Sequence, residues 1–192
     1  MFTGIINNMG IVTSVSDNLL SIKTENKIFK NIDTGTSVSV DGVCLTLKSL
    51  EDNNINFQIS NESINRSIIK DYKIDSYVNL ETPVKANDFL SGHIVQGHVD
   101  EVAKVIDITE EENNLWEFIF SSNNSKYLVD KGSVTINGVS LTTNSPNESV
   151  FTIAVIDETY KRTNFQYLEP GTQVNIEYDI LSKYIERLIN DN

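Results

Sequence analysis

Apolar and polar residues alternate in short runs along most of the chain. Val, Ile and Thr recur in these runs, and Asn, Asp, Gly and Pro separate them, which is typical of strands joined by tight turns. The runs occupy residues 9–16, 19–25, 36–49, 55–60 and 76–82, and then 97–108, 115–121, 133–144, 149–156 and 172–178. Turns at Asp41-Gly42 and Asn137-Gly138 split two of the runs. Short strands at this spacing predict an all-β fold of two six-stranded antiparallel Greek-key barrels.

A few segments depart from this alternation and predict helices. Short helices are expected at residues 62–69, 125–129 and 158–165. Residues 180–190 are amphipathic, with Ile180, Leu181, Tyr184, Ile185, Leu188 and Ile189 on one face and Lys183, Glu186 and Arg187 on the other. Because an isolated helix of this length is marginal in water, its apolar face must pack on something. The partner is either its own barrel or the same helix in other copies of the chain.

One hexapeptide occurs twice, as DGVCLT at residues 41–46 and as NGVSLT at residues 137–142. Flanking residues match at the same offset of 96, as in Val78-Asn79-Leu80-Glu81 and Val174-Asn175-Ile176-Glu177. A period this long exceeds that of solenoid repeats and predicts a duplicated domain. The expected units are residues 1–86, 87–178 and a terminal helix at 179–192, with a linker at 84–92. The duplication serves either stability alone or two similar pockets for two similar ligands.

Composition narrows the classes of function. The 192 residues carry a net charge of −12, which argues against nucleic acid as a partner. No signal segment and no apolar run of about 18 residues is present, so we expect a cytoplasmic protein without membrane attachment. Cys44 is the only cysteine, which excludes an intrachain disulfide. His93 and His98 are five residues apart, which is not a recognised zinc spacing, so no metal is expected.

The repeated motif carries the first candidate chemistry. Side chains two apart in a strand share a face, so Cys44 lies beside Thr46, and Ser140 beside Thr142. Gly42 and Gly138 stand where a strand turns and a ligand could touch the backbone. Backbone groups with a hydroxyl can hold the edge of a heteroaromatic ring. Small residues near a turn can equally be structural.

Three further side chains are candidates for chemistry, each with a structural alternative. Cys44 could be a nucleophile or an ordinary buried thiol. His98 could be an acid or base near neutral pH, or a hydrogen-bonded structural histidine. Asp179 could act in a site or simply cap the terminal helix. The GxSxG, P-loop and GxGxxG motifs are absent from the sequence.

Together these features resemble the riboflavin synthase alpha-chain family. The resemblance rests on the start MFTGII, the paired DGVCLT and NGVSLT, the segment SGHIVQGHVD (91–100) and YKRTN (160–164). It covers essentially the whole chain. Members of this family dismutate 6,7-dimethyl-8-ribityllumazine to riboflavin and a pyrimidinedione, without metal or cofactor. The resemblance implies a homotrimer joined by the terminal helices, with each active site between two subunits, and also suggests an association with lumazine synthase.

The resemblance also implies two sets of substrate-binding residues. The first set is Gly4, Ile5, Ile6, Cys44, Leu45, Thr46, Gln58, Ile59, Ser60, Asn61, Glu62 and Ser63. The second set is Gly97, His98, Val99, Lys131, Ser140, Leu141, Thr142, Ala154, Val155, Ile156, Asp157, Glu158 and Thr159. Phe2 is expected to stack on a substrate ring.

Residues linked to catalysis in the family fall on Phe2, Ser37, Cys44, His98, Ser140, Thr142 and Asp179. By this resemblance, His98 with Thr142 would transfer protons, and Cys44 or an activated water would add to the partner ring. Lumazine-binding antenna proteins share the fold and catalyse nothing, and they are the alternative interpretation. Retention of the motif in both halves favours the enzyme.

Overall fold

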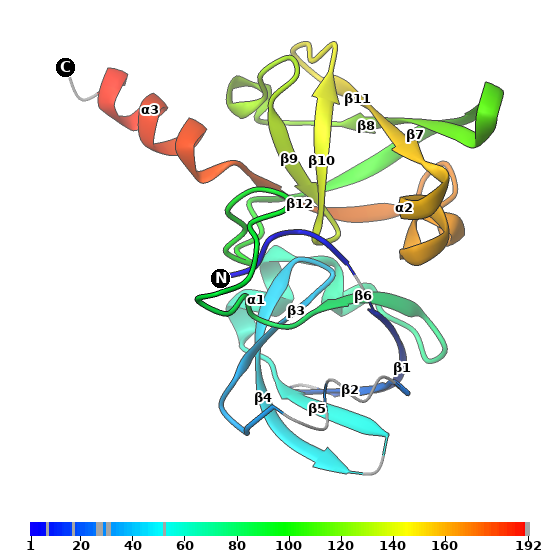
Figure 1. The fold of residues 1–192 in the computed structure, drawn as a ribbon, viewed down its shortest axis with the longest axis vertical. Coiled ribbons are helices and arrows are strands. Elements are labelled where there is room, and N and C mark those ends of the chain that lie inside the picture. The colour runs from blue at the N-terminus through cyan, green and yellow to red at the C-terminus, as the bar shows by residue number, and fades with distance from the viewer. Residues whose placement is uncertain (7, 17, 26–28, 30–31, 52, 191–192) are drawn as a thin grey trace.

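The computed structural model describes residues 1–6, 8–16, 18–25, 29, 32–51 and 53–190, and it contains two closed antiparallel barrels, one above the other in Figure 1. The first barrel contains β1 (Asn8–Ser16), β2 (Leu19–Lys23), β3 (Ser37–Val40), β4 (Val43–Glu51), β5 (Asn54–Gln58) and β6 (Tyr77–Glu81). The second contains β7 (Glu101–Glu111), β8 (Leu115–Ser121), β9 (Ser133–Ile136), β10 (Val139–Asn144), β11 (Val150–Ile156) and β12 (Gln173–Tyr178). The predicted fold class is confirmed.

The two barrels share one topology. The strand order around the first barrel is β1-β2-β5-β4-β3-β6, and the second repeats this order with the equivalent strands. The register also repeats, since Ser39 lies opposite Cys44 and Thr135 lies opposite Ser140. Each barrel encloses its own apolar core, and the second core is the richer in phenylalanine. Alternation of inward apolar residues along each strand produces both cores.

The helical segments are shorter than the sequence predicts. The expected helix at 62–69 is α1 (Asn61–Arg66) followed by the 3₁₀ turn η2 (Ile68–Asp71), because Ser67 between them is extended. Likewise, the expected helix at 158–165 is α2 (Asp157–Arg162) and η5 (Asn164–Tyr167). The expected helix at 125–129 is only the 3₁₀ turn η4 (Ser125–Tyr127). A second short turn, η3 (Glu112–Asn114), joins β7 to β8.

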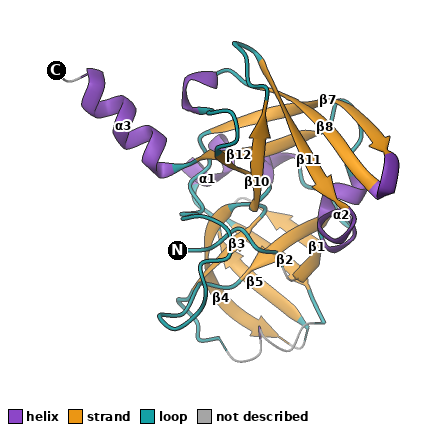
Figure 2. Ribbon diagram, turned by 45° about the horizontal axis from the view of Figure 1, so that its top comes forward, coloured by secondary structure: helices purple, strands orange, loops and turns teal. Residues whose placement is uncertain are grey.

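Two extended segments exchange between the barrels, and we name residues 1–6 arm 1 and residues 93–100 arm 2. They pair antiparallel, since Phe2 N donates to Val95 O at 2.7 Å and Val95 N donates to Phe2 O at 3.1 Å. Each arm leads into a strand of its own barrel but packs on the other: Ile6 belongs to the second core, and Val99 packs against the first. The strand expected at 97–108 therefore begins only at Glu101. Figure 2 shows these loop segments, in teal, between the barrels.

A buried polar network joins the barrels along their pseudo-twofold axis. Asn79 donates to Asn137 O at 2.9 Å and to Asn164 Oδ1 at 2.8 Å, and its equivalent Asn175 donates to Asp41 O at 2.8 Å. The Asp41 carboxylate accepts from Asn79 N, Asn164 Nδ2 and the Tyr72 hydroxyl. Burial raises the pKa of Asp41 to about 7, although these hydrogen bonds oppose the change.

The terminal helix α3 (Ile180–Asn190) leaves the second barrel and extends away from both barrels (Figure 1). Residues 191 and 192, the end of the expected 179–192 unit, lie outside the described residues. None of the residues of α3 is buried. Leu181, Ile185 and Ile189 line a cavity of about 360 Å³ between the helix and residues 126–133. Packing on its own barrel therefore covers only part of the apolar face. Within the described residues, no helix is long and apolar enough to cross a membrane.

Candidate functional site

The repeated hexapeptides lie beneath the exchanged arms. Cys44 N donates to Gly97 O of arm 2, and Ser140 N donates to Gly4 O of arm 1, both at 2.8 Å. The sequence interpretation had grouped Gly4 to Ile6 with Cys44, and Gly97 to Val99 with Ser140. The structure exchanges these groups, because each arm crosses to the opposite barrel.

Both crossings require glycine. Gly97 has φ +80°, and a Cβ there would lie 2.7 Å from Cys44 Cβ. Gly4 has φ +77°, and a Cβ there would lie 2.6 Å from Ser140 Cβ. Any other residue would push the arm off the strand. Gly42 and Gly138 instead contact each other on the pseudo-twofold axis, since a Cβ on Gly42 would lie 2.8 Å from Gly138 N. Their expected role in touching a ligand is wrong in this conformation.

The first candidate pocket has a volume of about 470 Å³, which is in the range of small-molecule sites. It lies beside Cys44 of β4, between arm 2 and α1. Its lining side chains are mostly polar: Val43, Cys44, Ser60, Glu62, Ser63, Arg66, Ser67, Gly97, His98, Val99 and Asp100. A row of polar residues continues across the neighbouring strands, with Ser37 opposite Thr46 and Thr46 opposite Gln58. This pocket suits a polar heterocycle with hydroxyl groups.

Beside Ser140, the second barrel holds a buried histidine. His93 Nδ1 lies 2.7 Å from Ser140 Oγ, and His93 Nε2 lies 3.1 Å from Thr135 Oγ1. His93 is 8% exposed. Burial lowers its pKa, and the negative charge of Asp179 partly opposes that. The imidazole is therefore neutral at pH 7, with one ring nitrogen able to accept a proton through Ser140.

Asp179 caps the terminal helix, which is one of the two roles that the sequence left open. Its Oδ1 accepts from Leu181 N at 3.0 Å, so it caps the first turn of α3. The same carboxylate is close enough to act electrostatically on His93. Asp179 therefore links the helix cap to the Ser140–His93 pair.

The remaining predicted residues fall into two groups, those whose side chains point into a barrel core and those whose side chains are at least partly exposed. Leu45, Ile59 and Val155 belong to the barrel cores, so only their backbone can face a ligand. Exposed or half-buried side chains remain at Ile5, Thr46, Gln58, Ser60, Asn61, Glu62, Ser63, Leu141, Thr142, Ala154, Ile156, Asp157, Glu158 and Thr159. Lys131 lies beside β10, where its backbone N donates to Thr143 O and its Nζ donates to Asn144 Oδ1.

Two expectations about side-chain roles need correction. Phe2 cannot stack on a ligand, because its ring is fully buried where the two arms pair. His98 lines the first pocket, whereas Thr142 lies on β10 of the second barrel. A single chain therefore does not bring His98 and Thr142, the expected proton-transfer pair, to the same pocket.

The sequence interpretation missed His93 and two glutamates that hold the arms. Glu81 accepts from Thr3 N and Gly4 N, and Glu177 accepts from Gln96 N, Gly97 N and His98 N. Burial raises the pKa of both carboxyl groups, and these N–H bonds oppose it. The matching positions of Glu81 and Glu177 in the repeat were a usable signal. For His93 the sequence offered none, because its partners lie on distant strands.

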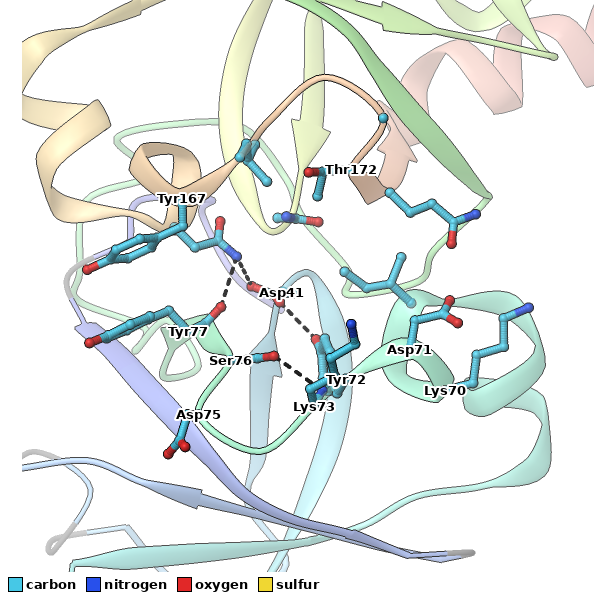
Figure 3. Close-up of a pocket in the computed structure, with 16 residues that line it drawn as sticks. Asp41, Lys70, Asp71, Tyr72, Lys73, Asp75, Ser76, Tyr77, Tyr167 and Thr172 are labelled. Carbon is cyan, nitrogen blue, oxygen red and sulfur yellow. Dashed lines mark hydrogen bonds between the residues drawn. The ribbon is translucent and has the colours of Figure 1, made fainter.

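Another cleft, with a volume of about 780 Å³, lies between the barrels at Tyr77 and Tyr167 (Figure 3). Asp41 lies on its floor, and Lys70, Asp71, Lys73 and Asp75 lie along its walls. The Tyr77 and Tyr167 rings stack at 4.2 Å. The hydrogen-bonding groups of Asp41 and Asn164 are used inside the protein. Only the first residue of each hexapeptide, Asp41 and Asn137, lines this cleft, and Cys44 and Ser140 do not.

Comparisons with known proteins agree with this architecture. The family model of the lumazine binding domain matches residues 3–83 and again residues 96–179. The riboflavin synthase of Actinobacillus pleuropneumoniae is 35% identical over 98% of this chain and 90% of its own length. That of Bacillus subtilis is 35% identical over 99% of this chain and 90% of its own length. The crystal structure of LumP with riboflavin superposes with a TM-score of 0.85 at 26% identity, covering 93% of this chain and 99% of LumP.

The fold, with one copy of the motif under an arm in each half, defines a protein built from tandem barrels. The chain belongs to the lumazine binding domain family, with one copy of the domain in each half. Its relatives at about a third identity are riboflavin synthases, and LumP has also been solved with 6,7-dimethyl-8-(1'-D-ribityl) lumazine, with a TM-score of 0.84.

Proposed function

We propose that this protein is a riboflavin synthase. It would convert two molecules of 6,7-dimethyl-8-ribityllumazine into one riboflavin and one 5-amino-6-ribitylaminopyrimidinedione. The observation that carries the proposal is the pair of related sites, each with a thiol or hydroxyl under an arm from the other half. A reaction between two identical molecules needs two such sites close together.

The reaction transfers a four-carbon unit from one lumazine to the other. The donor loses the two ring carbons and two methyl carbons that become part of the new ring of riboflavin. Atoms and electrons balance between the two substrate molecules, so no external oxidant is required. The protein must remove a proton from the acidic C7 methyl group and assist a nucleophile that adds to the other ring.

The site at Ser140 in the second barrel has a group suited to the proton transfer. Ser140 Oγ can pass a proton to neutral His93, which Thr135 holds from its other side. The roles expected for the remaining residues stay proposals: His98 with Thr142 in proton transfer, and Cys44 or a water in the addition. Ser37 would extend the polar row beside Cys44.

The site would be completed by a second copy of the chain. His98 and Thr142 belong to different barrels, so a facing pocket from another subunit can bring them together. The apolar side of α3 supports a homotrimer, because Leu181, Tyr184 and Ile185 are each 58% exposed or more in the single chain. Burying such side chains against other subunits would favour assembly by about 1.5–3 kcal/mol each.

A non-catalytic antenna protein is the second candidate, and the similarity to LumP favours it. A turnover assay separates the two. The purified protein is incubated with 6,7-dimethyl-8-ribityllumazine, and riboflavin and the pyrimidinedione are quantified. An enzyme produces one of each for two lumazines consumed. Bound, fluorescent lumazine that persists without riboflavin would establish the antenna function instead.

Three expectations from the sequence and its resemblance to the family remain proposals. They are the division into functional units at residues 86/87 and 178/179, a cytoplasmic location, and an association with lumazine synthase. Limited proteolysis, localisation of a tagged chain and co-purification would test them in turn.

A further inference from the structure

Ion pairs at Lys183 and Glu186 anchor α3 to other described parts of the chain. Lys183 Nζ donates to Asp100 Oδ2 at 2.7 Å, and Lys126 pairs with Glu186. The Lys126 pair attaches the helix to η4 of the second barrel. The Lys183 pair attaches it to arm 2, and its side chains are only 21% and 26% exposed. Both anchors are therefore ion pairs between a lysine and a carboxylate, and they attach α3 to different parts of the fold.

Asp100 stands at the end of arm 2, where the arm continues into β7. Its Oδ2 accepts from both Lys183 Nζ and Tyr178 N, the latter at 2.9 Å. Its own N donates to Ile176 O at 2.8 Å. Asp100 also lines the first pocket, together with His98 and Val99. A contact from α3 thus reaches a residue of the pocket wall directly.

Glu177 holds the rest of arm 2. It accepts from the backbone N–H groups of Gln96, Gly97 and His98, at 2.7, 2.8 and 2.9 Å. A charged acceptor makes these bonds strong only while it stays ionised. Burial raises the pKa of Glu177, the three N–H groups lower it, and the charge of Lys183 lowers it further. Lys183 therefore supports both carboxylates that fix arm 2.

We propose that Lys183 is a positioning residue for the first pocket. Through Asp100 and Glu177 it holds arm 2 so that Gly97 lies on Cys44 and His98 faces the ligand. Ligand affinity of the first pocket then depends on α3 being docked against arm 2, which links the helix expected to join subunits to the pocket. The inference rests on the proposed function for its ligand, 6,7-dimethyl-8-ribityllumazine.

Matched substitutions on α3 test the proposal. Lys183→Gln and Glu186→Gln each remove one charge from one anchor, and Lys183→Arg keeps the charge of the first. The chain has only two histidines, so imidazole NMR of the full-length protein reports each site during a lumazine titration. His98 reports the first pocket, and His93 reports the site at Ser140. Sedimentation confirms that the variants are compared in the same assembly state.

We expect Lys183→Gln to weaken lumazine binding at His98 about fivefold or more, as loss of a charge-assisted hydrogen bond would. Binding at His93 should change less than about twofold, as should both sites in Glu186→Gln. Lys183→Arg should restore most of the affinity. Without ligand, the amides of Gln96, Gly97 and His98 should exchange with solvent faster in Lys183→Gln than in Glu186→Gln.

Two results would overturn the proposal. One is unchanged affinity at His98 and unchanged amide exchange in Lys183→Gln. The other is an equal loss in Lys183→Gln and Glu186→Gln, which would mean that α3 acts only as a general support. If the unsubstituted protein binds lumazine at neither histidine, the proposed function fails, while amide exchange still decides whether Lys183 holds arm 2.

Discussion

The two motif sites, at Cys44 and at Ser140, share a backbone frame and differ in the side chains around it. In both, a glycine carbonyl of the exchanged arm accepts from the strand at 2.8 Å. In the second, buried His93 bridges Ser140 and Thr135. In the first, Ser39 stands opposite Cys44, and its buried hydroxyl makes no hydrogen bond with any part of the chain that the structure describes.

This difference indicates that the two halves kept the same backbone frame while the side chains around it diverged. The arms, their glutamates and the strand register are common to both halves, because they shape the pocket. The thiol, the exposed His98 and the buried His93 occur on one side only. Two copies of one substrate would thus bind alike and react differently.

The largest expected effect comes from separating the subunits, so that the sites of neighbouring chains no longer face each other. Replacing Leu181, Ile185 and Leu188 with Lys puts charges into the proposed subunit contact. We expect folded monomers whose first pocket still binds lumazine and whose turnover falls about 10³-fold or more, because the facing pocket is lost. Sedimentation, lumazine fluorescence and riboflavin production are measured on one sample.

A second variant, with three new lysines outside α3, controls for the effect of added positive charge alone. Leu50, Ile74 and Ile106 are also exposed apolar residues, and they lie outside α3. Replacing these three with Lys should leave assembly and turnover intact. A folded monomer of the α3 variant with normal turnover would refute the inter-subunit site, and a trimer that survives would refute the role of the helix.

Separate substitutions of His93 and His98 test how the two motif sites differ. His93→Gln should lower kcat about 10²-fold. It should also lower the free energy of unfolding by about 1–3 kcal/mol, because Ser140 and Thr135 lose a buried partner. His98→Gln should lower turnover but change stability by less than about 0.5 kcal/mol, because the imidazole is exposed. Stopped-flow kinetics and urea unfolding check both; equal stability losses would contradict the assignment.

The barrels also differ at the axis, where Asp41 stands opposite Asn137. Because burial raises the Asp41 pKa from 3.8 to about 7, folding favours its protonated form. Its stabilising contribution is therefore present at acidic pH and is lost as pH rises through 7. Asp41→Asn should raise the free energy of unfolding at pH 8 by about 1–4 kcal/mol and leave it nearly unchanged near pH 4.

The equivalent substitution in the second barrel is the control. Asn137→Asp adds a second carboxylate on the axis and should destabilise the protein at pH 8. Urea unfolding at both pH values measures the two variants. A loss of stability at pH 8 in Asp41→Asn would show that the ionised carboxylate is well accommodated, contrary to this account.

The smallest effect concerns the pH profile of the site at Ser140. Under the proposed function His93 would act as a base only when neutral, and burial lowers its pKa, so the acid limb of kcat/KM should lie below pH 6.5. Asp179→Asn removes a charge that raises this pKa and should move the limb lower still. The profile is recorded in the Asp41→Asn background, to exclude titration at the axis. An acid limb that moves upward would contradict the assignment.

Local patterns were enough to predict the barrels and the duplicated motif. Strand alternation and turn residues act over a few positions, so they can be recognised along the chain. The helix at 62–69 was predicted too long because Ser67 caps the following turn, with Ile69 N donating to its hydroxyl. That is a local event, and a closer examination of capping residues could have found it.

Contacts between distant segments could not be predicted in this way. Phe2 was expected to stack on a ligand, and the pairing of the arms buries it instead. Gly4 was grouped with Cys44 because the family resemblance implied that both belong to the first set of binding residues. The crossing of the arms reverses that grouping, and nothing within either arm specifies which barrel it covers.

The sequence by itself determined the two barrels, the glycine-hydroxyl motifs and the amphipathic terminal helix, because periodicity and turn chemistry depend on neighbours along the chain. Only the tertiary structure decided which arm covers which motif, that His93 joins Ser140, and that Lys183 reaches Asp100. These contacts form between segments tens of residues apart. They depend on how two closed barrels pack around one axis, which no short pattern encodes.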